Sequence, residues 1–301
     1  MSNRMLDLHG IFPPIPTPFD ETGAIDERAL ATHIDFLSAF DLSGYVVLGS
    51  NGEAVHLSME ERCALVKQVR SLISKDRLLI VGTGCPSTRQ TIEVSKCAAD
   101  LGADAVLVLP PHYYRGRMTR EALTRHFHAV ADTVDVPIII YNMPACTGLD
   151  MDVATIAALA SHQNIIGLKD SGGNVVKLGA LHQRLGDDFQ ILAGSASFLL
   201  PSLSVGAIGG VLALANIAPA QCLAIPTKAT EGDWKGAREL QVRVIEANSA
   251  VTRRWGVAGL KAAMALMGLP SSFVRPPLLD LDDEQIDSLK AILTEANILK
   301  T

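Results

Sequence analysis

Short apolar segments alternate with amphipathic segments along the whole chain. The apolar segments are rich in β-branched residues and mostly bounded by Pro or Gly, which predicts strands that are buried on both faces. The predicted strands are residues 11–19, 44–50, 78–84, 105–111, 137–144, 165–170, 190–195 and 207–214. The first of them contains four prolines, so we expect it to be irregular.

The amphipathic segments between these strands predict helices, and two of them begin with apparent capping boxes at Ser58 and Ser87. Eight strand–helix units follow one another without a linker or a change in composition. This pattern predicts an α/β fold, a closed (β/α)8 TIM barrel. We assign residues 1–230 to the barrel, as the catalytic domain, and residues 231–301 to a C-terminal helical extension of two or three helices.

The composition limits the classes of function. The 301 residues are 48% hydrophobic and only 5% aromatic, so aliphatic side chains build the core. The net charge of −6 gives no electrostatic reason to expect binding to nucleic acid or to an anionic membrane surface. Residues 189–227 carry no charge, but prolines interrupt them, which favours buried strands over a membrane span.

The cysteines and histidines form no recognisable motif. The five cysteines are an odd number without a Cys-x-x-Cys pair, so we expect reduced thiols. The early acid Asp7 and the lack of a long apolar segment argue against a secretory signal, so we expect a cytoplasmic protein. No metal-ligand spacing, dinucleotide fingerprint or Walker loop occurs, so we expect neither a metal nor a cofactor.

The chemistry of this fold is expected where the strands end. Lys169 lies at the end of the predicted strand 165–170, where a lysine has an apolar stem and a poorly solvated head. Such surroundings favour the neutral amine, which forms a Schiff base with a carbonyl substrate. The structural alternative is a salt bridge to Asp170 or to a helix end. Lys177 falls in a charge-flanked helical segment, and Lys261, on an apolar helix of the extension, is a partial rival.

Tyr141 ends the preceding strand and offers a phenol that could move the protons of imine formation. The alternative is a core tyrosine with a satisfied hydroxyl group. The loop after the second strand is glycine-rich, which lets backbone N–H groups turn toward a carboxylate. The pattern is common in such loops, but its position suits a 2-oxo acid. The predicted carboxylate site consists of Gly49, Ser50, Asn51 and Gly52.

The loop after the fourth strand contains Tyr113 and Tyr114, followed by Arg115 and Arg117. The two tyrosines could pack against a neighbouring subunit. The two arginines are more often solvated surface charges than substrate ligands.

Four motifs together resemble the dihydrodipicolinate synthase / N-acetylneuraminate lyase family of class I aldolases. They are the Gly-Ser-Asn-Gly-Glu loop, the Tyr-Asn-x-Pro strand end at Tyr141, the Gly-Leu-Lys-Asp sequence at Lys169 and the Gly-Gly-Val-x-Ala-x-Ala-Asn segment around Val211. The resemblance runs from about Ile11 to the C-terminus. It implies a (β/α)8 barrel with Lys169 as the Schiff-base lysine and Tyr141 as the acid/base.

Within the family, the sequence is most similar to 4-hydroxy-2-oxoglutarate aldolases, through segments such as 113–118, 147–150 and 250–254. The resemblance implies that a loop tyrosine comes from the neighbouring subunit, so that the catalytic minimum is a dimer and the usual assembly a homotetramer, a dimer of dimers. The remaining residues expected at the proton relay and the substrate are Ser50, Asn51, Tyr113, Tyr114, Gly194 and Val211.

One departure concerns the substrate. Dihydrodipicolinate synthases carry an arginine for the aldehyde's carboxylate just before the Thr-Gly that follows the Tyr-Asn-x-Pro strand end, and this chain has Cys146 there. We therefore expect cleavage of 4-hydroxy-2-oxoglutarate to pyruvate and glyoxylate. The alternatives are a dihydrodipicolinate synthase, an aldolase or dehydratase of 2-keto-3-deoxy sugar acids, and a non-catalytic protein that senses a 2-oxo acid.

Overall fold

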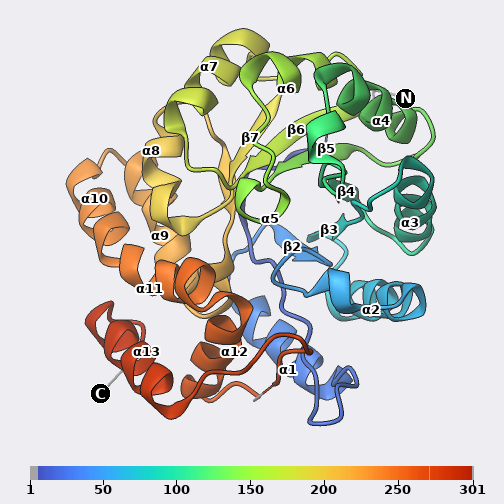
Figure 1. Cartoon of the computed structure of the whole chain (residues 1–301). Coiled ribbons are helices and arrows are strands. Elements are labelled where there is room, and N and C mark those ends of the chain that lie inside the picture. Colours follow the sequence, from blue (N-terminus) through green and yellow to red (C-terminus); the bar gives the residue numbers. More distant parts are fainter. Residues whose placement is uncertain (1–5, 271, 300–301) are drawn as a thin grey trace.

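The computed structural model describes residues 6–270 and 272–299, and it confirms the predicted (β/α)8 barrel (Figure 1). All ladders between neighbouring strands are parallel. The strands are β1 (Gly10–Phe12), β2 (Gly44–Val47), β3 (Leu78–Gly82), β4 (Ala105–Val108), β5 (Ile138–Asn142), β6 (Ile165–Asp170), β7 (Gln190–Ala193) and β8 (Gly209–Val211).

The barrel closes between β1 and β2 through an irregular pairing, with backbone hydrogen bonds that include Val46 N–H to Pro13 O at 3.0 Å and Ile15 N–H to Val46 O at 2.8 Å. The ladder runs β1-β8-β7-β6-β5-β4-β3-β2, and an isolated bridge between Pro14 and Val46 joins its two ends. The prediction of a strand over residues 11–19 is wrong in its length, because β1 ends at Phe12. The prolines that follow have no N–H group to donate to a ladder, so this segment cannot continue as a regular strand.

Helices surround the barrel in Figure 1. They are α1 (Glu27–Ser38), α2 (Met59–Leu72), α3 (Thr88–Asp100), α4 (Arg120–Ala131), α6 (Val153–Leu159), α7 (Val175–Leu185), α8 (Leu199–Leu203) and α9 (Pro219–Thr230). Ser58 makes the full capping box with Glu61, whereas Ser87 only accepts from the N–H of Gln90. The short α5 (Pro144–Thr147) follows β5 and lies over the middle of the barrel in Figure 1.

In the described residues, four short 3-10 helices lie in the loops between strands and helices. The C-terminal extension follows α9. The 3-10 helices are η1 (Ala54–His56), η2 (Arg115–Arg117), η3 (Ala196–Phe198) and η4 (Ala213–Asn216). The extension contains α10 (Trp234–Arg243), α11 (Ile245–Ser249), the π-helical turn η5 (Ala250–Arg254), α12 (Gly256–Leu266) and α13 (Asp283–Glu295). Its described part thus has four α-helices rather than the two or three predicted, and the division at residue 230 stays a prediction.

The core has two parts because strand side chains alternate between the two faces of the sheet. One cluster fills the barrel interior and includes Phe12, Val46, Ile80, Leu107, Ile139, Tyr141, Leu192 and Val211. A larger cluster lies between the strands and the surrounding helices. None of the helices in the described ranges is long and apolar enough to cross a membrane.

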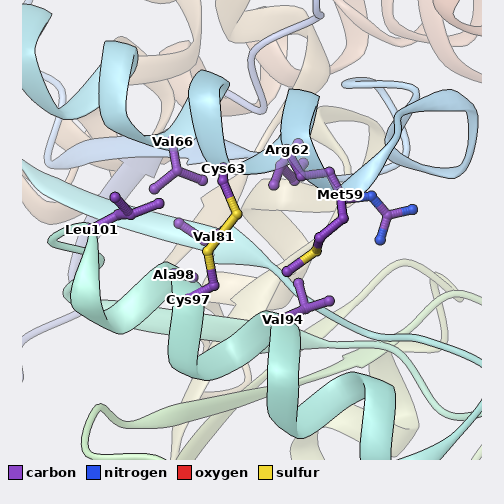
Figure 2. Close-up of a pocket in the computed structure, with 10 residues that line it drawn as sticks. Met59, Arg62, Cys63, Val66, Val81, Val94, Cys97, Ala98 and Leu101 are labelled. Atoms are coloured by element: carbon purple, nitrogen blue, oxygen red, sulfur yellow. A yellow bond between two sulfur atoms is a disulfide. The ribbon is translucent and has the colours of Figure 1, made fainter.

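The expectation of five reduced thiols is wrong for two cysteines. Figure 2 shows a disulfide between Cys63 of α2 and Cys97 of α3, whose Cα atoms are 6.8 Å apart. The two residues are 34 positions apart in the sequence and meet only because α2 and α3 are neighbours on the barrel. Cys85, Cys146 and Cys222 are free, and Cys146 is exposed.

Candidate active site

The two predicted catalytic side chains lie next to each other at the ends of β5 and β6. The strands pair Tyr141 with Lys169 in register, and the Nζ atom of Lys169 lies 3.9 Å from the centroid of the Tyr141 ring. Both side chains are buried, with 3% and 4% exposure for Lys169 and Tyr141 respectively. The strand ladder therefore places an amine and a phenol at one point of the barrel.

The next residues in both strands, Asn142 and Asp170, also pair in register. Because side chains alternate, they lie on the opposite face of the sheet from Tyr141 and Lys169. Asp170 is fully buried, and its carboxylate accepts from Lys177 Nζ of α7 at 2.8 Å and from Asn142 Nδ2 at 2.8 Å. Asp170 thus forms its ion pair with Lys177 and not with Lys169. A salt bridge to Asp170 is therefore not the role of Lys169.

Lys177 is the centre of this outer network and not a solvated helix residue. Its Nζ atom also donates to Asp150 at 2.6 Å, and only 6% of its side chain is exposed. Burial opposes the charge, but hydrogen bonds to Asp150 and Asp170 raise the pKa of Lys177 above its ordinary value. Within the described chain, Lys169 Nζ has no ion-pair or hydrogen-bond partner.

The glycine-rich loop after β2 brings Ser50 toward the same point. Ser50 Oγ lies 3.4 Å from the Tyr141 hydroxyl group. The loop is a tight turn in which the N–H of Gly52 donates to Gly49 O and that of Glu53 to Ser50 O. The backbone N–H groups of Ser50 and Asn51 bond to no described residue, so both are free to receive a carboxylate.

Tyr113 and Tyr114 lie away from this group. Their side chains are 80% and 70% exposed, and their rings contact each other edge to face at 5.0 Å. In the part of the chain that the structure describes, neither makes a hydrogen bond to Tyr141 or Ser50. A single chain therefore brings together Lys169, Tyr141 and Ser50, but not the predicted tyrosine of the relay.

Gly194 and Val211 lie at the ends of neighbouring strands. The N–H of Gly194 donates to Asp170 O at 2.7 Å, and a Cβ atom at Gly194 would come within 2.1 Å of Ser171 Oγ. Only glycine fits this close approach to β6. Val211 is 1% exposed and belongs to the interior cluster that contains Tyr141. Contact of either residue with a substrate stays a prediction.

Sequence reasoning missed the role of Glu53, the last residue of the loop motif. Its carboxylate accepts from Lys261 Nζ at 2.7 Å and from the backbone N–H of Arg275 at 2.9 Å. These partners are 208 and 222 residues away in the sequence, so no local signal could have identified them. Because Lys261 is paired with Glu53, it is no longer a rival to Lys169.

The match with a protein-family model decides the family. The model of the dihydrodipicolinate synthetase family matches residues 7–296. The chain belongs to this family. Members of the family are lyases and aldolases, and this chain is accordingly a lyase of the dihydrodipicolinate synthetase family.

Relatives within the family carry different names. A probable mitochondrial 4-hydroxy-2-oxoglutarate aldolase of Emericella nidulans is 38% identical over 301 residues, covering 98% of this chain and 97% of the relative. A 4-hydroxy-tetrahydrodipicolinate synthase of Acidiphilium cryptum is 36% identical over 291 residues, covering 97% and 99%. The names of the relatives therefore support the family and leave the aldehyde substrate open.

Solved structures of the family have the same fold. Dihydrodipicolinate synthase DapA-2 of Bacillus anthracis superposes with a TM-score of 0.92 at 29% identity, covering 96% of this chain and 99% of that chain. The prophage protein YagE of E. coli K12, solved in complex with pyruvate, superposes with a TM-score of 0.91 at 31% identity, covering 97% and 99%.

The described residues contain no group of three or more His, Cys, Asp or Glu side chains that could hold a metal ion.

We expect Lys169 to form an imine with pyruvate, because its buried amine has no counter-ion among the described residues. Borohydride reduction in the presence of pyruvate should add one pyruvate-derived adduct, which peptide mass spectrometry should locate on Lys169. Lys169→Arg should abolish the adduct and keep the fold, since a guanidinium group supplies no neutral amine. An adduct on Lys177 or Lys261 would contradict this assignment.

We expect Tyr141→Phe to lower kcat by roughly 10²–10⁴-fold, the usual contribution of a general acid–base group. The substitution removes the hydroxyl group that faces Ser50 and leaves the ring that covers Lys169. Steady-state kinetics should show the loss, while the thermal unfolding temperature should change little. A decrease of less than threefold would mean that Tyr141 is a packing residue.

Proposed function

We propose that this protein is a pyruvate-forming class I aldolase that cleaves 4-hydroxy-2-oxoglutarate to pyruvate and glyoxylate, reversibly and without a metal ion. The observation that carries the proposal is the buried amine of Lys169, which contacts the Tyr141 ring and has no counter-ion among the described residues. No carboxylate therefore blocks the amine, and a lysine amine is the nucleophile that forms a Schiff base with a carbonyl substrate.

The proposed reaction begins when the Lys169 amine attacks the 2-oxo carbon. Loss of water gives a protonated imine, with Tyr141 moving the protons through Ser50, which lies 3.4 Å away. Tyr141 then takes the proton of the 4-hydroxyl group, the C3–C4 bond breaks, and the imine accepts the electron pair as an enamine. Glyoxylate leaves, C3 of the enamine is protonated, and water releases pyruvate from Lys169.

The loop after β2 would hold the carboxylate next to the 2-oxo group. The N–H groups of Ser50 and Asn51 are unengaged by any described residue, and the Ser50 side chain already faces Tyr141. Hydrogen bonds to a charged acceptor are the strong ones, so two backbone donors fix the acid end of the substrate. The reacting carbonyl is then held beside Lys169.

The choice of substrate rests on α5 and the loop beside it. Cys146 is exposed on α5, and a cysteine cannot make the bidentate contact that an arginine makes with a carboxylate. The Arg115 guanidinium packs on Gly148, so closely that a Cβ atom at Gly148 would lie 2.5 Å from Nη1. We propose that Arg115 supplies a positive charge for the second carboxylate of the substrate.

The assembly belongs to the same proposal. Tyr113 and Tyr114 are exposed aromatic side chains that contact each other, and in the described chain neither is hydrogen-bonded to Lys169, Tyr141 or Ser50. We propose that Tyr114 completes the proton relay of a neighbouring subunit. A dimer is then the catalytic minimum, and a homotetramer made of two such dimers is the expected assembly.

The rivals are a dihydrodipicolinate synthase, an enzyme of 2-keto-3-deoxy sugar acids, and a non-catalytic sensor of 2-oxo acids. The two enzyme rivals form the same imine as the proposed aldolase, so the choice of aldehyde must distinguish them. We expect aldol formation from pyruvate with glyoxylate to exceed any condensation with aspartate semialdehyde. Losing a charge-assisted contact costs roughly 1.5–3 kcal/mol, or about 10–150-fold. Coupled assays should measure kcat/KM for glyoxylate and for aspartate semialdehyde, each with pyruvate. The same comparison should include the cleavage or dehydration of sugar-derived 2-keto-3-deoxy acids.

A higher kcat/KM for aspartate semialdehyde would overturn the substrate and leave the imine mechanism intact. Binding of pyruvate without turnover of any substrate would favour the sensor.

We expect Arg115→Ala to raise the KM for glyoxylate or 4-hydroxy-2-oxoglutarate by about 10-fold or more, because a charged contact to the second carboxylate is lost. Trapping of pyruvate at Lys169 should be unaffected. Arg117→Ala is the matched control, since Arg117 lies at the other end of the same helical turn η2. Equal effects of the two variants would show that Arg115 acts only through the general charge of the loop.

A further inference from the structure

The turn that carries Ser50 is held in an unfavourable backbone conformation on both sides. Leu48 precedes it with a φ of 57°, and Glu53 ends it with a φ of 50°. Residues with a Cβ atom avoid this left-handed region, so the surrounding structure must hold them there. Leu48 is held by packing against β3. Its carbonyl oxygen lies against Gly82 of β3, so closely that a Cβ atom at Gly82 would be only 2.1 Å from it.

Glu53 is held by charge instead of packing. Its side chain and that of Lys261 are each 1% exposed, and the two make an ion pair of 2.7 Å. Lys261 Nζ also donates to Phe273 O at 2.6 Å. The second oxygen of Glu53 accepts from the N–H of Arg275 at 2.9 Å and contacts His56 Nδ1 at 3.2 Å. We refer to Glu53, Lys261 and Arg275 as the Glu53 clamp.

Arg275 connects the clamp to the loop after β1, to the end of the loop after β2 and to α2. Its guanidinium donates to Gly23 O after β1 at 2.7 and 3.0 Å, and to His56 O at 2.8 Å. It also forms an ion pair with Glu61 of α2. Hydrogen bonds from Arg275 hold the pKa of Glu61 at about 2. The extension is therefore fastened through ionic groups to the loops after β1 and β2.

An aromatic side chain of the core packs against the two cations of the clamp. The ring of Phe19 lies 4.4 Å from both Lys261 Nζ and the Arg275 guanidinium carbon, so an aromatic face covers the two cations. Thr17 Oγ1 donates to Gly52 O at 2.7 Å and fixes the turn from the β1 side. The turn is thus restrained at Gly52 and at Glu53, on either side of its last peptide bond.

We propose that Glu53 is a positioning residue for the reaction. Anchored by Lys261 and Arg275, it fixes the turn that brings Ser50 Oγ to Tyr141 and directs the Ser50 and Asn51 N–H groups to one point. The helical extension then acts on catalysis through a carboxylate that does not touch the substrate. The inference rests on the proposed function of the Lys169 site, and the test below separates the two.

The main variant is Glu53→Met/Lys261→Met. It removes both buried charges together and replaces them with side chains of similar length, which avoids the unpaired buried charge that a single substitution would leave. Lys235→Met is the control, because it removes an exposed lysine of the same extension whose partner Glu239 is 4.0 Å away. Thermal unfolding shows which variants are folded. Lys261→Met, which leaves Glu53 in place, is a second variant measured in the same two assays.

Two measurements decide. Amide hydrogen exchange of residues 46–57 should be faster in the double variant than in the wild type and in the control. The value of kcat/KM for 4-hydroxy-2-oxoglutarate should fall by roughly 10²-fold, with a higher KM and a lower kcat, because a small misplacement of catalytic groups costs about this much.

Unchanged exchange in the turn would overturn the proposal whatever the activity. Faster exchange with kcat/KM within threefold of the wild type would show that the Glu53 clamp only stabilises the fold. A wild-type protein that does not cleave 4-hydroxy-2-oxoglutarate would refute the proposed function, while the exchange comparison would still test whether the clamp holds the turn.

Discussion

The register between β5 and β6 is the constraint on which the candidate site depends. It pairs Tyr141 with Lys169 on the inner face of the barrel and Asn142 with Asp170 on the outer face. A shift of one residue would exchange the two faces and place Asp170 inside, beside the tyrosine. The buried pairing of Asp170 with Lys177 of α7 makes such a shift costly, since it would leave charges without partners.

Much of the fold could be predicted because its signal is local. Apolar periodicity and proline or glycine boundaries located all eight strands, and the rule that chemistry lies at strand ends pointed to Lys169 and Tyr141. The errors have physical causes. Proline lacks an N–H group, so β1 is shorter than its apolar segment suggests. Cys63 and Cys97 become neighbours only when α2 and α3 pack side by side.

The least predictable part of the site is the set of buried ion pairs that hold its strands and loops in place. Lys177 was placed in a charge-flanked helix, yet it is buried between two carboxylates from other segments. Glu53 is held by residues of the C-terminal extension that are more than two hundred positions away. A single sequence shows which side chains end a strand, but it does not show which distant charges reach them. The catalytic candidates were therefore predictable, and the residues that hold them in place were not.

The two buried ion pairs share an electrostatic consequence. A carboxylate beside Lys169 would form an ion pair with its side chain and compete with the substrate for it. The motif acids closest to the candidate site in sequence are Glu53 and Asp170, and each is paired with a lysine from a helix: Lys261 of α12 and Lys177 of α7. Because these acids are neutralised by other lysines, Lys169 keeps no carboxylate partner among the described residues. The carboxylates that it would meet in the barrel are then those of the substrate itself.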